Sequence, residues 1–375
     1  MVLIELVFWA CIALILYTHG GYPVVLWALT RTRKLSDALA EPDPMPTVSL
    51  IVAAHDEGMS IVRLLRSLNA LDYPRDLLEI VVVSDGPANR TLEVAAKAGA
   101  DVFFEVPRRG KVAALNAGVD RSGGEVLAFA DANAQWEPSA LRWLVARLCQ
   151  PGVGYVCGQV RFTSSGGENE EGLYWRYEMA VRDMESRLGG VTAGNGAINA
   201  VHRETYLELE PGRGQDISFP FELTKRAWRA EYEPGAEATE PLASTIGDEF
   251  GRKRRMMTGA WRTILGTELL SPRGYDPLYA FQIYSHRLLR YTTPILHGLA
   301  FVLNLFLLGQ GSVYVATLAL QLALLVAAAL AQVLPARPLL IARYYVAVTA
   351  ASAAGLWDYL RHGVPATWEK AEGTR

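Results

Sequence analysis

Short apolar runs alternate with helically periodic stretches through the middle of the chain. Four of these runs have the length and apolar content of strands that are buried on both faces of a sheet. They are residues 47–54, 79–84, 101–106 and 125–130. Between them the apolar residues recur at helical spacing, as they do in residues 61–71. Strands that alternate with helices in this way predict an α/β domain with a mainly parallel, nucleotide-binding sheet.

Helical and strand patterns continue after the fourth run. We expect a helix over residues 137–149, a strand over 154–162 and a helix over 173–188. A basic amphipathic stretch at residues 254–270 suits a membrane surface, and we assign residues 251–290 to interfacial helices. These patterns place a water-facing domain at residues 47–250.

Long uncharged stretches lie near both ends of the chain. Residues 6–30 contain no Asp, Glu, Lys or Arg, which is enough to cross a hydrocarbon core about 30 Å thick. The alternative is a cleaved signal peptide, which Glu5 and the length of the run disfavour. We therefore expect an N-terminal transmembrane helix over residues 1–30 and two or three C-terminal ones over residues 291–360.

Basic residues predict the orientation in the membrane. Arg31, Arg33 and Lys34 begin a basic, proline-rich linker at residues 31–46, and the positive-inside rule then places the following domain in the cytoplasm. We expect four spans, although the basic tail at residues 361–375 would then end outside. A last segment that lies in the interface would remove this conflict, so three spans remain the alternative.

Composition agrees with a membrane protein. Apolar residues make up 51% of the chain, and mean hydropathy is +0.14. The net charge of −3 argues against nucleic acid as the main partner. The three cysteines have no metal-ligand spacing and fit a reducing compartment. From the apolar ends of the chain we expect an integral protein, in a bacterial plasma membrane, with membrane lipids as partners.

Polar residues follow the apolar runs where a parallel sheet would bind a ligand. Asp131 and Asn133 come after the fourth run, and their oxygens can share a divalent cation with a diphosphate. The residues that follow the other runs are His55, Asp56, Glu57, Asp85 and Lys111. Carboxylates for base and ribose and a lysine for phosphate predict a nucleotide diphosphate site. For Asp85 and Asp131 the alternative is a turn residue, and for Lys111 a solvated charge.

These motifs together resemble the family 2 glycosyltransferases, which have the GT-A fold. The resemblance covers residues 47–261: Ala54-His55-Asp56-Glu57 is similar to the opening motif, Ser84-Asp85-Gly86 to the second acidic motif, Gly110-Lys111 through Asn116 to the GKxxALN stretch, and Asp131-Ala132-Asn133 to the DxD motif. It implies a nucleotide diphosphate sugar as donor and Mg²⁺ or Mn²⁺ as cofactor. Asn133 stands where the second Asp is usual, so Asp131 becomes the main metal carboxylate.

Gln215 and Asp216 resemble the family's ED motif, whose Asp is the general base. An inverting transfer needs a carboxylate that takes the proton from the acceptor hydroxyl. The resemblance implies this role for Asp216, with Gln215 on the acceptor side. Asn195, in a glycine-rich loop that lets a ligand approach the backbone, is also expected there. The alternative is that Asp216 is the N-cap of a helix over residues 217–228.

Residues 252–256 resemble the QxxRW motif of membrane-bound polysaccharide synthases. Arg252 stands for the Gln and Met256 for the Trp, while Arg255 is kept and is expected to neutralise the leaving diphosphate. Arg252 is expected to contact the nucleotide sugar. The alternative is a basic run on anionic lipid headgroups. Loss of the tryptophan removes a stacking platform for sugar and argues against a processive polymer synthase.

We therefore expect an inverting hexosyl- or N-acetylhexosaminyl-transferase that acts at the cytoplasmic membrane face. Its acceptor is expected to be a lipid-linked sugar or a glycan. The alternatives are a processive polysaccharide synthase, in which subunits could associate, and a non-catalytic nucleotide-sugar-binding membrane protein. The substitutions at Asn133 and Met256 are the features that favour the last of these.

Overall fold

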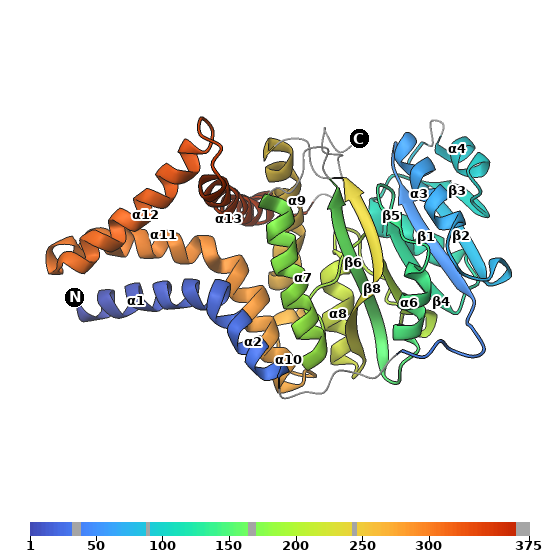
Figure 1. Cartoon of the computed structure of the whole chain (residues 1–375), viewed down its shortest axis with the longest axis horizontal. Coiled ribbons are helices and arrows are strands. Elements are labelled where there is room, and N and C mark those ends of the chain that lie inside the picture. Colours follow the sequence, from blue (N-terminus) through green and yellow to red (C-terminus); the bar gives the residue numbers. More distant parts are fainter. Residues whose placement is uncertain (32–38, 88–90, 164–169, 242–245, 365–375) are drawn as a thin grey trace.

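The structure is a computed structural model that describes residues 1–31, 39–87, 91–163, 170–241 and 246–364. An α/β domain forms one side of the molecule, and apolar helices from both ends of the chain extend away from it (Figure 1). The N-terminus lies at the far end of these helices. The linker at residues 31–46 and the tail at residues 361–375 fall partly outside the described residues.

An eight-stranded sheet with the order β3-β2-β1-β4-β7-β6-β8-β5 forms the centre of the domain. The first half is parallel and consists of β1 (Val48–Ala54), β2 (Leu78–Asp85), β3 (Val102–Val106) and β4 (Val126–Asp131). The helices between these strands are α3 (Met59–Asn69), η2 (Arg75–Leu77), α4 (Thr91–Lys97) and α5 (Lys111–Asp120). The expected alternation of strand and helix is confirmed over this half.

The second half of the sheet is mixed. It consists of β5 (Gln135–Trp136), β6 (Val153–Thr163), β7 (Asn199–His202) and β8 (Arg229–Pro241). β7 is antiparallel to both β4 and β6, whereas β8 is parallel to β6. The accompanying helices are α6 (Ala140–Leu148), α7 (Glu170–Leu188), η3 (Arg203–Thr205), α8 (Gln215–Lys225), α9 (Ile246–Gly266) and η4 (Glu268–Leu270). The sheet is mostly parallel, as expected, but β5, β7 and β8 were not predicted.

Both faces of the sheet are covered. On one face Leu50 packs in a core with Leu64 of α3, and on the other Ile51 packs in a core with Leu115 of α5 and Phe129 of β4. Burying one such side chain stabilises the fold by roughly 1.5–3 kcal/mol. Burial on both faces explains why β1, β2 and β4 read as continuous apolar runs rather than as alternating patterns. The prediction of burial on both faces is wrong for β3, because it is an edge strand whose Phe103 and Glu105 are exposed.

The remaining helices are long and apolar. They are α1 (Val2–Leu16), the π-helix η1 (Tyr17–Gly21), α2 (Tyr22–Thr30), α10 (Pro277–Gln282), the π-helix η5 (Ile283–Leu288), α11 (Leu289–Leu307), η6 (Leu308–Gln310), α12 (Ser312–Leu330) and α13 (Arg337–His362). Four helical segments of the described chain are long and apolar enough to cross a membrane: Val2–Thr30, Pro277–Gln310, Ser312–Leu330 and Arg337–His362. Membrane-crossing helices at both ends agree with the sequence pattern.

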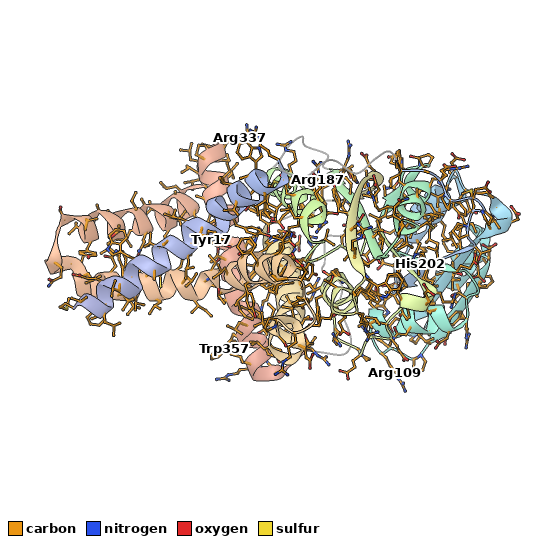
Figure 2. All side chains as sticks on the ribbon, turned by 90° about the horizontal axis from the view of Figure 1, so that it is seen from below. Tyr17, Arg109, Arg187, His202, Arg337 and Trp357 are labelled. Atoms are coloured by element: carbon orange, nitrogen blue, oxygen red, sulfur yellow. The ribbon has the colours of Figure 1, made fainter. Side chains whose placement is uncertain are left out.

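The helix α13 has a different direction from the others. It runs from Arg337 to beyond Trp357 across the direction of α1, α11 and α12 (Figure 2). It packs on α9, where Trp261 Nε1 donates to the Ser352 carbonyl at 3.1 Å. Arg254 of α9 also forms an ion pair with Asp358 of α13 at 2.6 Å. These contacts join α13 to the surface of the α/β domain.

Candidate active site

The end of β4 holds a charged pair at the carboxyl edge of the parallel strands. Asp131 is the last residue of β4, and Lys111 is the first residue of α5. The Lys111 ammonium forms an ion pair with the Asp131 carboxylate. Burial acts to lower the pKa of Lys111, but the Asp131 carboxylate outweighs it, so the pKa is raised above its usual value. Lys111 is therefore a permanent cation beside Asp131.

A pocket of about 420 Å³ opens around this pair. The residues predicted from the sequence that line it are Glu57, Lys111, Asp131, Asn133, Asn195, Gln215, Asp216, Arg252 and Arg255. They come from the ends of β1 and β4, the starts of α5 and α8, the middle of α9 and the loop between α7 and β7. The structure thus brings most of the predicted site together in one crevice.

The remaining three predicted residues do not line this pocket. The Asp85 carboxylate accepts backbone N–H bonds from Arg109 at 2.8 Å and Gly110 at 3.1 Å. His55 Nδ1 lies 2.6 Å from the Asp85 carbonyl oxygen, and Asp56 has a left-handed φ of 52°. Asp85 therefore fixes the loop that presents Lys111. A direct contact of these residues with a nucleotide stays a prediction.

Asp216 lies in the first turn of α8. That helix begins at Gln215 with Gly214 as its N-cap, so the alternative of Asp216 as an N-cap is wrong. Burial raises the pKa of the Asp216 carboxyl, although the cations Lys111 and Arg287 partly offset this effect. A carboxylate whose pKa is raised is a stronger base, which suits proton abstraction.

Two neighbours of Asp216 differ in how their amides are used. The Asn195 amide donates to the Gly158 carbonyl at 2.8 Å and accepts from the Ile198 N–H at 2.9 Å, so it holds the loop together. The Gln215 amide nitrogen is buried and has no hydrogen-bond partner. An unsatisfied buried donor that lines a pocket is available to a ligand.

The arginines of α9 reach the same pocket. Arg252 forms an ion pair with Glu249 at 2.7 Å, and its guanidinium lies 5.8 Å from the Phe162 ring. Both Arg252 and Arg255 line the pocket, together with Met256. Arg254 instead faces α13. The basic run therefore divides between the pocket and the helix packing.

The oxygens around Asp131 fit a divalent cation that takes part of its shell from a ligand. No group of three or more His, Cys, Asp or Glu side chains in the described ranges is placed to hold a metal ion. Asp131 and Asn133 line the pocket together. A Cβ atom at Gly196 would lie 2.9 Å from Asp131 Oδ2, so the glycine leaves this oxygen accessible. A cation here would need phosphate or water oxygens to complete its shell.

Three lining residues were not predicted from the sequence. Phe162 and Trp175 form an aromatic pair with ring centroids 5.0 Å apart, and the Trp175 indole nitrogen is buried without a partner. Glu240 enters from the end of β8. The signal in the sequence for Trp175 was a tryptophan near the start of the predicted helix over residues 173–188. Glu240 gave none, because β8 had not been predicted.

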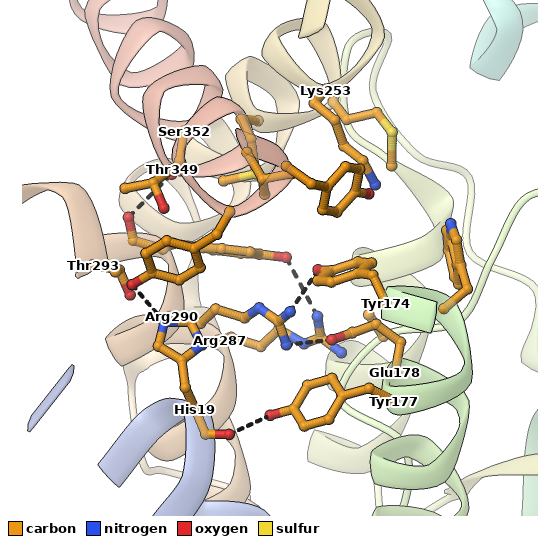
Figure 3. A pocket seen from close by; sticks show the side chains of 18 of the residues that line it. His19, Tyr174, Tyr177, Glu178, Lys253, Arg287, Arg290, Thr293, Thr349 and Ser352 are labelled. Atoms are coloured by element: carbon orange, nitrogen blue, oxygen red, sulfur yellow. Dashed lines mark hydrogen bonds and ion pairs between the residues drawn. The ribbon is translucent and has the colours of Figure 1, made fainter. Parts of the chain in front are cut away.

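A second cavity of about 480 Å³ adjoins the first. Both are lined by Trp175, Gly194, Asp216 and Met256. The second cavity lies between α7, α9, η5, α11 and α13, and side chains from these helices point into it (Figure 3). Asp216 therefore stands at the boundary between a polar crevice in the α/β domain and a cavity among the apolar helices.

The sequence matches a known family over part of its length. Residues 49–208 match the family Glycosyl transferase family 2. This range contains Lys111, Asp131 and Asn133, whereas Asp216 and Arg255 lie after it. The match therefore covers the donor side of the pocket.

Curated proteins with similar sequences carry glycosyltransferase names. An N-acetylglucosaminyltransferase of Rhizobium meliloti is 28% identical over 266 residues, which are 64% of this chain and 62% of that protein. Glycosyltransferase AglE of Haloferax volcanii is 30% identical over 128 residues, which are 33% of this chain and 42% of that protein. The chain thus spans about half the length of these two relatives.

A solved structure has a similar fold over nearly the whole chain. Mannosyltransferase PcManGT from Pyrobaculum calidifontis, in complex with GDP-Man and Mn²⁺, superposes with a TM-score of 0.72 and 23% sequence identity. The match covers 95% of this chain and 99% of that one. The similarity includes the apolar helices as well as the α/β domain.

Proposed function

The chain contains a family 2 glycosyltransferase domain in a GT-A fold, and from this premise we propose that it is a membrane-bound, metal-dependent, inverting glycosyltransferase. The donor is a nucleotide diphosphate sugar, and the acceptor is a lipid-linked sugar or a glycan at the cytoplasmic face. The observation that carries the proposal is the position of Asp216. Its carboxylate lies between the crevice that holds Asp131 and a separate cavity on the membrane side.

On the donor side, the residues act on the diphosphate. Asp131 and Asn133 would hold Mg²⁺ or Mn²⁺, which would neutralise the charge of the leaving group as a Lewis acid. Lys111, Arg252 and Arg255 add positive charge around the same oxygens. Glu57 and the loop fixed by Asp85 position the nucleoside. A sugar can stack on the aromatic rings of Phe162 and Trp175, a surface that the Met256 side chain does not provide.

On the acceptor side, Asp216 takes a proton. The acceptor oxygen forms a bond to the anomeric carbon while the bond from that carbon to the diphosphate oxygen breaks on the opposite face. The hydroxyl proton passes to the Asp216 carboxylate, and the electron pair of the broken bond leaves with the diphosphate. Attack opposite the leaving group inverts the configuration.

Release of nucleoside diphosphate tests this proposal. We expect the full-length protein in detergent to release it from one member of a panel of UDP- and GDP-linked hexoses and N-acetylhexosamines. Release should require Mn²⁺ or Mg²⁺ and stop when EDTA is added, because the cation neutralises the leaving group. The same panel with protein denatured beforehand is the control. Failure to release from every donor, or release that survives EDTA, would contradict the proposal.

For the membrane arrangement we propose three spans and a surface helix. The helices α1, α11 and α12 cross the bilayer, while α13 lies at the cytoplasmic surface beside α9 because it crosses their direction (Figure 2). The tail with Arg361 then stays on the cytoplasmic side, in agreement with the positive-inside rule. This removes the conflict that a fourth span would create.

Labelling of single added cysteines distinguishes three spans from four. In intact cells, a membrane-impermeant maleimide should label Gly309→Cys, between α11 and α12, but should label His362→Cys only after permeabilisation. Both positions suit a probe, because a side chain at Gly309 meets open space and His362 is exposed. The protein without an added cysteine gives the background from Cys11, Cys149 and Cys157. Labelling of His362→Cys in intact cells would make α13 a fourth span.

A further inference from the structure

The cavity on the membrane side of Asp216 contains more buried cations than carboxylates. Its charged lining residues are Arg182, Lys253, Arg287, Arg290, Glu178 and Asp216. Arg290 is paired with Glu178, and Lys253 lies 3.6 Å from Glu249. Arg182 and Arg287 remain, and their side chains come from α7 and η5.

These two arginines form no direct ion pair with a carboxylate among the described residues. Within the described part of the chain, no Asp or Glu oxygen lies within ion-pair distance of Arg182 or Arg287. Arg287 donates to the hydroxyls of Thr192 at 2.8 Å and Tyr291 at 3.4 Å. Arg182 donates to the Gly194 carbonyl at 3.0 Å, and its Nε has no partner.

Both guanidinium groups are buried, Arg182 with 5% and Arg287 with 6% of its surface exposed. Burying an unpaired charge is costly unless an anion compensates it. Glu185 reaches Arg287 only through the Thr192 hydroxyl, which accepts from Arg287 at 2.8 Å and donates to Glu185 at 2.9 Å, and the Glu185 carboxylate also binds Tyr22 at 2.6 Å and His286 at 2.7 Å. An external anion is therefore the natural partner of the two arginines.

The rest of the cavity is apolar and aromatic. Its walls include Pro294 of α11 and Ile341, Tyr344 and Val348 of α13. Lys253, Arg290 and His19 also line the cavity (Figure 3). The cavity thus combines buried cations with an apolar wall between α11, which we place across the bilayer, and α13, which we place at the membrane surface. A free anion would not need the apolar end.

We propose that this cavity binds the phosphate group of a membrane lipid, that Arg182 and Arg287 hold the phosphate, and that the lipid chain leaves between α11 and α13. This assignment rests on the proposed function, since it makes the lipid the carrier of the acceptor and places the rest of its headgroup against Asp216. Arginine suits the role because its planar fork binds phosphate oxygens in pairs.

Native mass spectrometry of the full-length protein in detergent tests the assignment with farnesyl phosphate, farnesol and inorganic phosphate. We expect farnesyl phosphate to bind at least about tenfold more tightly than either of the others, because each lacks one half of the ligand. Arg182→Gln and Arg287→Gln should each weaken farnesyl phosphate binding by roughly 30-fold or more, whereas Arg287→Lys should lose less. Arg187→Gln, an exposed arginine on the same helix as Arg182, should leave it unchanged.

A second variant guards against loss of folding. Val348→Trp on α13 fills the apolar end and should reduce binding of farnesyl phosphate without touching either arginine. Binding of nucleoside diphosphate with Mn²⁺ in the other pocket reports whether each variant is folded. Equal affinity for farnesol and farnesyl phosphate, or Gln variants that bind normally, would overturn the proposal. Inorganic phosphate binding as tightly as farnesyl phosphate would overturn the lipid part.

The lipid assignment and the proposed function fail in different ways. If the function fails, no donor releases nucleoside diphosphate, whatever lipid is present. If only the lipid assignment fails, release occurs with Mn²⁺ but the protein shows no preference for farnesyl phosphate. If both hold, release occurs and farnesyl phosphate binds through Arg182 and Arg287.

Discussion

Replacing Asp216 with Asn is expected to slow sugar transfer by roughly 100- to 10,000-fold, the usual contribution of a general base. The amide keeps the size of the side chain but cannot take a proton. Donor and metal binding should change little, because Asp216 stands on the acceptor side of the pocket that contains Asp131. The measurements are initial rates of nucleoside diphosphate release and the affinity for nucleoside diphosphate with Mn²⁺.

The matched control is Asp183→Asn, an acidic residue of α7 that pairs with Arg187 at 2.6 Å away from both cavities. It should keep the full rate. An Asp216→Asn variant that transfers sugar at the normal rate would remove Asp216 as the base. A variant that no longer binds nucleotide would show a structural role instead.

The pH dependence of the rate should follow the same carboxyl group. Burial raises the pKa of Asp216, and the base acts only in its ionised form. The rate should therefore fall as pH decreases through the raised pKa, at a higher pH than for an ordinary Asp with a pKa of about 3.9. This acidic limb should be absent from the residual rate of Asp216→Asn. A limb that persists in the variant would belong to another group.

Replacing Asp131 with Asn should weaken metal-dependent donor binding by more than about 100-fold, since even partners outside the ligand shell approach that effect. The change removes the one carboxylate of the proposed metal site and also the partner of Lys111. Titration of Mn²⁺ in the presence of nucleoside diphosphate measures the effect. Saturating Mn²⁺ should restore part of the activity.

The matched comparison replaces the amide of Asn133 with a carboxylate. Asn133→Asp adds a second carboxylate to the same pocket and should tighten Mn²⁺ binding, because affinity for hard cations rises with ligand charge. If Asp131→Asn binds Mn²⁺ with nucleoside diphosphate as well as the original protein does, the metal site lies elsewhere. If Asn133→Asp has no effect, Asn133 is not a ligand.

The donor half of the site was largely predictable from the sequence. Asp131 ends a strand and Lys111 begins a helix, and both elements can be recognised from the local pattern of apolar residues. The carboxyl edge of a parallel sheet then brings such residues close together. The role of Asp85 was less predictable. The carboxylate turned out to bind the backbone of Arg109 and Gly110, a contact that no spacing in the sequence indicates.

The apolar helices were predictable in position, but the number that cross the membrane and the direction of α13 were not. Their length and lack of charge can be read directly from the sequence. The segments that form α1, α11, α12 and α13 were therefore all recognised as apolar helices. The direction of α13 depends on its packing against α9, through Trp261 and Ser352, and on the Arg254–Asp358 pair. Contacts of this kind join segments that are far apart in the chain, so they produce no periodic pattern in the sequence.

By itself the sequence determined the parallel strands and the apolar helices and selected Asp131 and Asp216 as candidate site residues, because each depends on a local pattern of residues or on a short motif. Only the tertiary structure decided that Asp216 lines two cavities and that Arg182 and Arg287 are buried without a direct ion pair to any carboxylate that the structure describes. The physical reason is that burial and charge compensation depend on all neighbours in space. Arg182 on α7 and Arg287 on η5 become neighbours only when the apolar helices pack against the α/β domain.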